Sequence, residues 1–361
     1  MSITLVKNHS RHINRNICIL LYTKCFLTFL LLTFVLTVPK ISVSQERYRL
    51  VFWNVENLFD TFDDSTRNDD IFTPTGENHW NNKRYKTKLT HLYQTFVAIG
   101  SVQDKVFDMP LAIGLAEVEN DKVLRDLTKG TPLRRFNYDF IHFDSPDQRG
   151  IDNALLFKKK AYKPFLSRAI CVSDSSKGYF TRDILLVEGT TDKGDTIVFL
   201  VNHFPSRLGG TTADKQRMAI AKRLRYIMDT ISTSHPSATI VVMGDFNSTP
   251  KDTEIKDGLM HKDDTHFINL MASAKAGQGS YNYQGHWSFL DQIIVSHNLA
   301  DIKSTCPLTL YSKQGQAFEA DFLLIDDEKN LKQKPFRTYL GVKYQGGYSD
   351  HLPVYIDLIR K

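Results

Sequence analysis

The chain has 361 residues, of which 42% are hydrophobic and 24% charged, an ordinary globular composition with enough length to bury a large core. Its formal net charge is +6, but residues 1–44 hold five basic and no acidic residues, so the remainder carries only +1. Net charge therefore gives no support to a protein that binds nucleic acid through an overall basic surface, although a local basic face is not excluded.

Residues 1–44 have the pattern of a secretory signal peptide. A basic, polar start is followed by an apolar run at 26–38, and then by the small-x-small sequence Ser42-Val43-Ser44. This order suits cleavage before Gln45. The sequence therefore predicts a mature protein that begins near Gln45 and is secreted or periplasmic.

The alternative for this segment is an uncleaved membrane anchor. Counted from Ile17, the apolar segment is long enough to cross a bilayer if Lys24 is tolerated inside it. After the signal no internal repeat or low-complexity linker interrupts the chain, which predicts one domain over residues 45–361. The mature part keeps Cys171 and Cys306, and the sequence leaves open whether they form a disulfide or stay as two buried thiols.

Strands and helices are mixed along the mature chain. Runs of β-branched and other apolar residues predict buried strands at 49–53, 111–116, 153–157, 184–187, 196–201, 239–243, 293–295 and 354–358. Apolar residues at helical spacing predict amphipathic helices at 83–99 and, capped by Thr211 or Thr212, from there to about residue 232. The polar stretch 61–82 is typical of a long surface loop.

Polar residues follow many of these strands, most clearly at 239–250. The run Thr239 to Met243 is followed by Gly-Asp-Phe-Asn-Ser-Thr-Pro, which must end the strand in a loop. There Asp245 can accept a proton and Asn247 can donate a hydrogen bond, while Phe246 between them can turn inward and anchor the loop. An ordinary turn is the alternative, because Asp and Asn favour turns for local reasons.

Single polar residues stand at other predicted strand ends. Glu117 follows the second strand, where a hard oxygen ligand for a divalent cation could stand, although such acids are more often solvated caps. Arg182 precedes the fourth strand and could clamp a phosphate, or form a surface ion pair with Asp183. His203 ends the fifth strand and could donate to a phosphate oxygen, although a lone histidine is usually structural.

The first and last predicted strands complete the set. Asn54 follows the first strand, Asp291 stands just ahead of the seventh, and Asp350 and His351 stand side by side ahead of the last. No serine nucleophile elbow, Walker loop, glycine-rich dinucleotide turn or Cys/His zinc pattern competes with these residues in the sequence.

Taken in order, these residues resemble the motifs of the endonuclease/exonuclease/phosphatase superfamily, the group of deoxyribonuclease I. The resemblance covers about residues 48–358, and Gly-Asp-Phe-Asn at 244–247 together with Ser-Asp-His-Leu-Pro at 349–353 is its most specific part. Asn-Val-Glu-Asn-Leu-Phe-Asp at 54–60 and Asn-His-Phe-Pro-Ser-Arg at 202–207 are most similar to the secreted bacterial nuclease-like branch.

The resemblance implies an α/β fold, a four-layer sandwich in which two mostly antiparallel sheets pack face to face with helices outside. It implies hydrolysis of phosphate esters with a divalent metal, usually Mg²⁺, with Mn²⁺ or Ca²⁺ as alternatives. The implied metal site consists of Glu117, Asp350 and, beside the metal, Asn54. The chain departs from the family pattern at one position that matters. Several relatives carry a DNA-contacting Arg two residues after the metal-binding Glu, where this chain has Glu119, which argues against duplex DNA as the substrate.

The remaining matched residues resemble the family's catalytic and phosphate-binding groups. Asp245 and Asn247 match the pair that activates or orients the attacking water, and Asp291 matches the carboxylate that holds His351. The scissile phosphate is contacted, by the same resemblance, by Arg182, His203 and Asn247.

The sequence thus predicts a secreted, metal-dependent phosphodiesterase, with endonuclease action on nucleic acid as the first reading. One alternative is a phosphatase or phosphodiesterase that acts on a small-molecule or lipid phosphate. The other is a non-catalytic extracellular binding module, which is disfavoured because no matched catalytic position is missing. We further expect a monomer with no stable protein partner, and membrane contact only if the signal stays uncleaved.

Overall fold

We describe a computed structural model of the chain, which places residues 46–361 except 102–106, 263 and 302. The chain divides into two units, Met1–Gln45 and Glu46–Lys361, and the account below concerns the second. The predicted signal peptide and its cleavage site lie outside the described residues. None of the helices in the described residues is long and apolar enough to span a bilayer.

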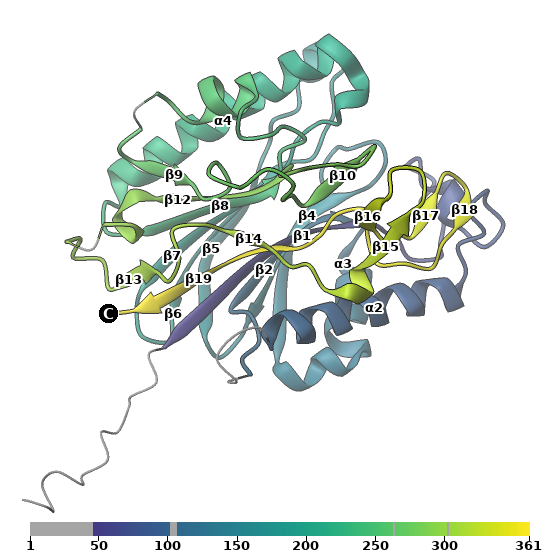
Figure 1. Cartoon of the computed structure of the whole chain (residues 1–361), viewed down its shortest axis with the longest axis horizontal. Coiled ribbons are helices and arrows are strands. Elements are labelled where there is room, and N and C mark those ends of the chain that lie inside the picture. Colours follow the sequence, from purple (N-terminus) through teal and green to yellow (C-terminus); the bar gives the residue numbers. More distant parts are fainter. Residues whose placement is uncertain (1–45, 102–106, 263, 302) are drawn as a thin grey trace, which may run out of the picture. The chain divides into compact units, whose positions relative to one another are not determined.

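Two large β-sheets form the centre of the described unit (Figure 1). The first has the strand order β13-β19-β1-β2-β4-β3, with β14 also paired to β19, and the second has the order β5-β6-β7-β8-β12-β9. In the described part of the chain, β1 runs parallel to β2 and β7 parallel to β8, while the other pairs in these sheets are antiparallel. The sheets are therefore mixed and mostly antiparallel, as predicted.

The strands of the first sheet are β1 (Arg47–Leu58), β2 (Ala112–Val118), β3 (Tyr138–His142), β4 (Asp152–Lys158), β13 (Leu308–Leu310), β14 (Gln316–Ala317) and β19 (Val354–Arg360). Those of the second are β5 (Tyr162–Ile170), β6 (Ile184–Thr191), β7 (Thr196–His203), β8 (Thr239–Asp245), β9 (Phe267–Asn269) and β12 (Asp291–Ser296). Three small hairpins are β10 (Tyr281–Tyr283) with β11 (His286–Ser288), β15 (Leu324–Asp327) with β16 (Lys332–Pro335), and β17 (Tyr339–Leu340) with β18 (Lys343–Tyr344).

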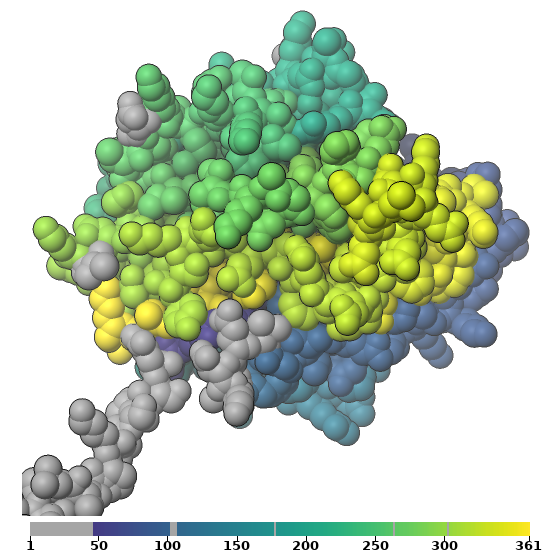
Figure 2. All heavy atoms as spheres, viewed as in Figure 1, coloured from purple at the N-terminus to yellow at the C-terminus, as the bar shows by residue number. Residues whose placement is uncertain are grey.

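The helices are α2 (Asn82–Gly100), the short α3 (Asp121–Arg125) and α4 (Gly210–Ser234). In Figure 1, α4 covers one outer face of the paired sheets and α2 lies on the opposite side. The hairpins β15–β18, drawn in yellow-green to yellow, lie against the segment that contains α2 (Figure 2), where Arg84 stacks on Tyr344 with its guanidinium carbon 4.4 Å from the ring centroid.

The buried apolar residues form three cores, because successive side chains of a central strand point to opposite faces of its sheet. Phe52 of β1 and Met243 of β8 belong to the core between the two sheets. Trp53 points the other way, and its ring meets Phe96 of α2 at 6.0 Å in an edge-on contact. Val242 likewise points outward into the core under α4. Because these strands are buried on both faces, they read as continuous apolar runs, and the layers form the predicted four-layer α/β sandwich.

The start of α4 differs from the prediction. The helix begins at Gly210, so Thr211 and Thr212 lie inside it and neither caps it. A short turn of 3-10 helix at Arg207–Gly209 leads directly into α4, and Ser206 caps that turn through a hydrogen bond from the backbone N–H of Leu208. The N-cap position of α4 itself is Gly209, so no side chain caps this helix.

Cys171 and Cys306 do not form a disulfide. Both are free, with Cys171 exposed and Cys306 buried. The expectation of two buried thiols is correct for Cys306 and wrong for Cys171, which lies just after the partly exposed strand β5.

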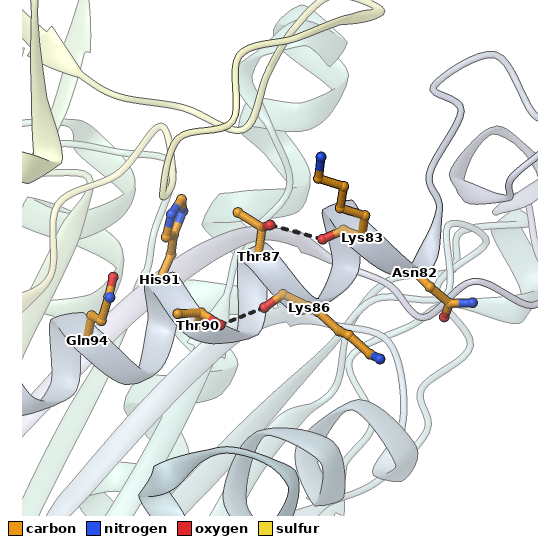
Figure 3. A pocket seen from close by; sticks show the side chains of 7 residues that line it. All are labelled: Asn82, Lys83, Lys86, Thr87, Thr90, His91 and Gln94. Atoms are coloured by element: carbon orange, nitrogen blue, oxygen red, sulfur yellow. Dashed lines mark hydrogen bonds between the residues drawn. The ribbon is translucent and has the colours of Figure 1, made fainter.

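At the start of α2, Asn81 accepts hydrogen bonds from the backbone N–H groups of Lys83 (3.0 Å) and Arg84 (3.2 Å). We expect Asn81→Ala to lower the free energy of unfolding by about 1 kcal/mol, because these N–H groups lose their acceptor. The control is Asn82→Ala, since Asn82 is equally exposed and its side chain extends into solvent (Figure 3). Urea unfolding followed by circular dichroism measures both, and equal losses would contradict a capping role for Asn81.

Candidate active site

The strand pairing brings polar residues from distant segments to one end of the two sheets. His203 pairs with Asp245 in the parallel register of β7 and β8, and Asp291 pairs with Asp245 across β8 and β12. In the other sheet, Asn54 pairs with Ala116, which places Glu117 next to it. Strand ends are rigid mounts, so these side chains have fixed directions toward one another.

Asp291 and His351 form a buried pair. The Asp291 Oδ2 atom lies 2.6 Å from Nδ1 of His351, and the Nε2 atom of the same ring faces Oδ2 of Asp245 at 3.7 Å. Burial opposes a charged imidazole, but the carboxylates of Asp291, Asp245 and Asp350 raise the pKa of His351 well above its usual value. His351 is therefore an imidazolium at neutral pH, as the predicted pairing requires.

The ring of His351 is also held from its side. The Tyr281 ring lies against it with a centroid distance of 4.8 Å, and the two residues form an isolated β-bridge. The Trp53 indole N–H donates to the His351 carbonyl at 2.9 Å. Tyr281 was not identified from the sequence, because nothing in its local pattern indicates a partner seventy residues away.

Asp245 is the most connected of the predicted catalytic residues. Its Oδ2 accepts from Asn54 Nδ2 at 3.0 Å and its Oδ1 from the backbone N–H of Asn247 at 2.8 Å. Burial and the charge of Asp291 raise the pKa of Asp245 to about 6, against the opposing charge of His351. A carboxylate with such a pKa can both hold and release a proton near neutral pH, which suits a general base.

The loop after Asp245 has the predicted anchor. Phe246 is fully buried, meets Phe204 edge-on at a centroid distance of 5.0 Å, and donates its backbone N–H to the Leu290 carbonyl. Asn247 has a left-handed backbone (φ 47°), and one hydrogen of its amide group is donated to the Phe204 carbonyl at 2.9 Å. The loop is thus an ordered mount for the two polar residues.

Glu117 stands at an irregularity shared by β1 and β2. The register shifts between Asn54 and Leu58, and Glu56, Asn57 and Glu117 all have positive φ values of 49°, 52° and 64°. Such backbone conformations are costly for residues other than glycine and cluster at functional sites. Here they allow the Asn57 N–H to donate to Glu117 Oε2 at 2.8 Å while Oε1 faces Asn54 Nδ2 at 3.4 Å.

The Glu117 carboxylate is suited to bind a divalent cation. Burial would raise its pKa, but the Arg149 guanidinium, 3.7 Å from Oε1, the Asn57 N–H and the more distant charges of His351 and Arg182 lower it. Glu117 is therefore ionised, and its Oε1 makes only long contacts with the described residues. One hard carboxylate oxygen completed by water is a donor set that Mg²⁺ accepts, so these residues fit the predicted metal.

Asp350, the second predicted metal ligand, has a different partner in this structure. Its Oδ2 accepts from Arg337 Nη2 at 3.0 Å, and among the described residues no hydrogen bond or ion pair joins it to Glu117. Arg337 also reaches the buried Glu56 at 3.4 Å. A role for Asp350 in metal binding stays a prediction, and it requires the carboxylate to exchange Arg337 for the ion.

A buried lysine supports this side of the site. Lys88 of α2 is almost fully buried and donates to the Thr338 hydroxyl at 2.6 Å, while the Thr338 N–H donates to Glu56 at 2.6 Å. The sequence contains a signal for it, because Lys88 falls on the helix face that buries Tyr85 and Leu92. The hydrogen bonds that Lys88 donates to the Thr338 hydroxyl and to the Tyr348 carbonyl could not be predicted from that pattern.

Two of the three residues expected to contact the scissile phosphate, Arg182 and His203, are buried. Arg182 pairs with Asp147 at 3.1 Å, instead of the predicted alternative Asp183, and donates to the Phe204 carbonyl at 2.8 Å. His203 Nε2 lies 3.7 Å from Asp245 Oδ2. Burial and the charges of Arg182, Arg149 and His351 hold the pKa of His203 well below its usual range, so it is a neutral donor.

A separate pocket of about 550 Å³ lies along the exposed face of α2 (Figure 3). Its lining includes Lys83, Lys86 and His91, and none of the predicted site residues. Thr87 and Thr90 turn their hydroxyls back to the carbonyls of Lys83 and Lys86. This pocket is not part of the candidate active site.

Several solved structures have the same fold. An endonuclease/exonuclease/phosphatase family protein from Bacteroides thetaiotaomicron has a TM-score of 0.53 and 17% identity over 88% of this chain and 99% of its own. TDP2 of D. rerio, complexed with a single-strand DNA product, has a TM-score of 0.52 and 16% identity over 87% of this chain and 99% of its own. The mannosyl-6-phosphatase Bt3783 of B. thetaiotaomicron has a TM-score of 0.51 and 15% identity over 86% of this chain and 99% of its own. At these identities the likeness shows the fold.

Direct comparison with curated proteins finds no match. The model of the Endonuclease/Exonuclease/phosphatase family matches residues 49–360, which includes every described residue of the candidate active site. Members of this family are metal-dependent phosphoric ester hydrolases. With its sandwich of two sheets and its polar strand ends in the family order, the chain belongs to the endonuclease/exonuclease/phosphatase family.

Proposed function

We propose that this protein is an exported, Mg²⁺-dependent phosphodiesterase that cleaves nucleic acid as an endonuclease. The observation that carries the hydrolytic part is the buried Asp291–His351 pair, which faces Asp245 beside the ionised Glu117. When bound at Glu117 with Asn54 alongside, Mg²⁺ supplies positive charge that neutralises the phosphodiester and favours attack on it.

The protein groups have complementary parts in this hydrolysis. Asp245, with a pKa of about 6, accepts the proton of the attacking water, and Asn247 orients that water. The His351 imidazolium stabilises negative charge that develops on the phosphoryl group in the transition state, and the neutral His203 donates an N–H to a phosphate oxygen.

Nucleic acid is supported as the substrate by aromatic side chains beside the site. Tyr281 lies against His351, and Tyr283, on the same face of strand β10, is 63% exposed. The exposed ring of Tyr283, two residues from Tyr281, offers a surface on which an unpaired base can stack. The TDP2 structure with a single-strand DNA product shows that this fold can hold such a ligand in a relative.

Single strands are favoured over regular duplex by the environment of Glu119. It lies two residues from Glu117 and accepts a hydrogen bond from the Asp60 N–H. Burial, with the charges of Asp60 and Asp69, raises the pKa of Glu119 to about 8. A largely neutral carboxyl therefore stands where several relatives have the cation that holds duplex DNA.

The proposed substrate is tested with circular single-stranded DNA, because a circle has no ends and only endonuclease action can open it. Purified protein with Mg²⁺ is expected to linearise and then shorten the circle, and EDTA is expected to stop the reaction. Intact circles beside cleaved linear strands would overturn endonuclease action, and intact nucleic acid of every form would overturn the nucleic-acid substrate.

A second candidate is a phosphatase on a small phosphorylated molecule. Two partly exposed arginines, Arg149 beside Glu117 and Arg337 beside Asp350, favour it, because they could hold further anionic groups of a compact substrate. The mannosyl-6-phosphatase with the same fold shows that a relative can be specific for a phosphorylated sugar. Phosphate release from mannose 6-phosphate, with circular DNA left intact, would favour this candidate.

Export is proposed from the order of basic, apolar and small residues in 1–44. We expect the protein isolated from outside the cytoplasm to begin near Gln45, because the signal is removed after Ser44. N-terminal sequencing and intact mass of that protein provide the measurement. Full-length chain in the membrane fraction, with residues 1–44 attached, would show an anchor instead.

A further inference from the structure

A second group of metal-ligating side chains lies at the junction of β3, β4 and α3. His142 is the last residue of β3, Asp152 the first of β4, and Asp144 lies in the loop between them. One ligand atom from each of these three residues lies within 4.8 Å of the corresponding atoms of the other two. None of them belongs to the phosphoester site described above.

His142 is buried and directed into this group. Its side chain is only 2% exposed, and its Nε2 atom has no hydrogen-bond partner among the described residues. The nearest charged atom to Nε2 is Oδ2 of Asp152, at 3.6 Å, which is too long for a hydrogen bond but suits two ligands of one ion. The side chain of Asp152 is itself only 4% exposed, so this pair is shielded from water.

The other nitrogen of the ring is fixed by a carboxylate. Nδ1 of His142 lies 3.1 Å from Oδ1 of Asp121, the first residue of α3, whose other oxygen reaches Arg125 at 3.5 Å. A metal-ligating histidine typically donates its second N–H to a carboxylate, which sets the tautomer and leaves the free nitrogen toward the ion. Asp121 can accept the N–H of Nδ1 in this way, which leaves Nε2 of His142 free to bind an ion.

The local charge also favours a cation. Carboxylate oxygens of Asp121, Asp144 and Asp152 lie 3.1, 4.0 and 3.6 Å from the ring nitrogens of His142. An open pocket of about 480 Å³, lined in part by Asp121, His142 and Asp144, gives solvent access to the group. Oδ1 of Asp144 lies 4.0 Å from Nδ1, the ring nitrogen that Asp121 holds, and this side chain is 75% exposed, so Asp144 reaches an ion at Nε2 by turning its carboxylate toward it.

We propose that His142, Asp144 and Asp152 form a second cation site, which takes Zn²⁺ with water in the remaining position. One imidazole nitrogen and two carboxylate oxygens are ligands that Zn²⁺ accepts in a tetrahedral arrangement, whereas Mg²⁺ and Ca²⁺ favour oxygen alone.

The site has a structural consequence for the active site. Residues 143–151 connect two of its ligands, and Asp152 Oδ1 already accepts from the Ser145 N–H at 3.0 Å. The same loop carries Asp147, the partner of Arg182, and Arg149, the neighbour of Glu117. An ion at the base of the loop therefore fixes the segment that supplies both contacts.

Zinc binding by the purified protein, stripped of metal with chelator, tests the proposal. Equilibrium dialysis with Zn²⁺ and the visible absorption of added Co²⁺ are measured on the wild type, His142→Gln, Asp144→Asn and Asp121→Asn. We expect His142→Gln and Asp144→Asn to lose one bound ion, and Asp121→Asn to bind it about 10–100-fold more weakly. Because Asp144 is exposed, its variant keeps the test decisive if His142→Gln does not fold.

Two variants serve as controls. Asp139→Asn removes a carboxylate of the same strand that pairs with Lys159, and Glu117→Gln alters the phosphoester site. Both are expected to keep the ion. If His142→Gln and Asp144→Asn bind as many Zn²⁺ ions as the wild type and equally tightly, or if Glu117→Gln alone removes the ion, the second site does not exist. His142 is then an imidazolium paired with its carboxylates.

Discussion

Glu117→Gln is expected to lower turnover roughly 10²-fold or more while leaving the fold intact. The amide keeps the volume of the side chain and can still accept from the Asn57 N–H, but it carries no charge to bind a cation. Turnover is measured at saturating Mg²⁺, so that weaker metal binding alone does not account for the loss. Circular dichroism and thermal unfolding verify that the variant is folded.

The matched control is Glu119→Gln, two residues further along. Because the pKa of Glu119 is about 8, this side chain is largely protonated at neutral pH, and glutamine changes it little. We expect nearly wild-type turnover from Glu119→Gln. If Glu117→Gln also turns over at the wild-type rate, Glu117 has no part in the mechanism.

Asp291 and His351 are expected to act as one unit. His351→Ala should cost roughly 10²-fold in rate, because it removes a buried cation from the site. The double change with Asp291→Asn should cost about as much as His351→Ala alone, since Asp291 acts through the imidazole that it holds at 2.6 Å. The measurement is a double-mutant cycle on the substrate that proves to be cleaved. Single losses that multiply in the double variant would show that the two residues are independent.

The same pair predicts the direction of a pH effect. In the wild type the neighbouring carboxylates raise the pKa of His351, so the cation persists through neutral pH and activity falls only as this proton is lost at high pH. Asp291→Asn removes the carboxylate charge that lies beside Nδ1 of His351, and this change lowers the pKa of His351. The alkaline fall in the pH–rate profile should therefore move to lower pH, and an unchanged profile would contradict the pairing.

The central strands could be predicted from sequence because they are buried on both faces. β7 and β8 have apolar side chains in two cores, so their sequences are continuous apolar runs with a polar residue at the end. The family motif at these ends identified the fold, which the structure confirms. β5 was missed because most of its residues are partly or fully exposed, and the hairpins from β15 to β18 were missed because their strands have only two to four residues each.

The contacts around the site could be predicted only in part. Phe246 as the anchor of its loop is confirmed, because its role depends on neighbours in the same loop. The partners Asp147 of Arg182 and Arg337 of Asp350 are wholly tertiary, and no periodicity indicates them. The roles assigned to the site residues, the metal, the substrate and the export of the protein stay predictions until the experiments above are done.

The pairing of β1 with β19 affects how the protein can fold. Arg47 lies opposite Ile359 and Phe52 opposite Val354, so the first described strand takes its neighbour from the last residues of the chain. Contacts over such sequence separations close large loops and slow the rate-limiting step of folding. Since β19 lies between β13 and β1, and His351 stands just ahead of it, the sheet and the Asp291–His351 pair are complete only once this long-range contact has formed.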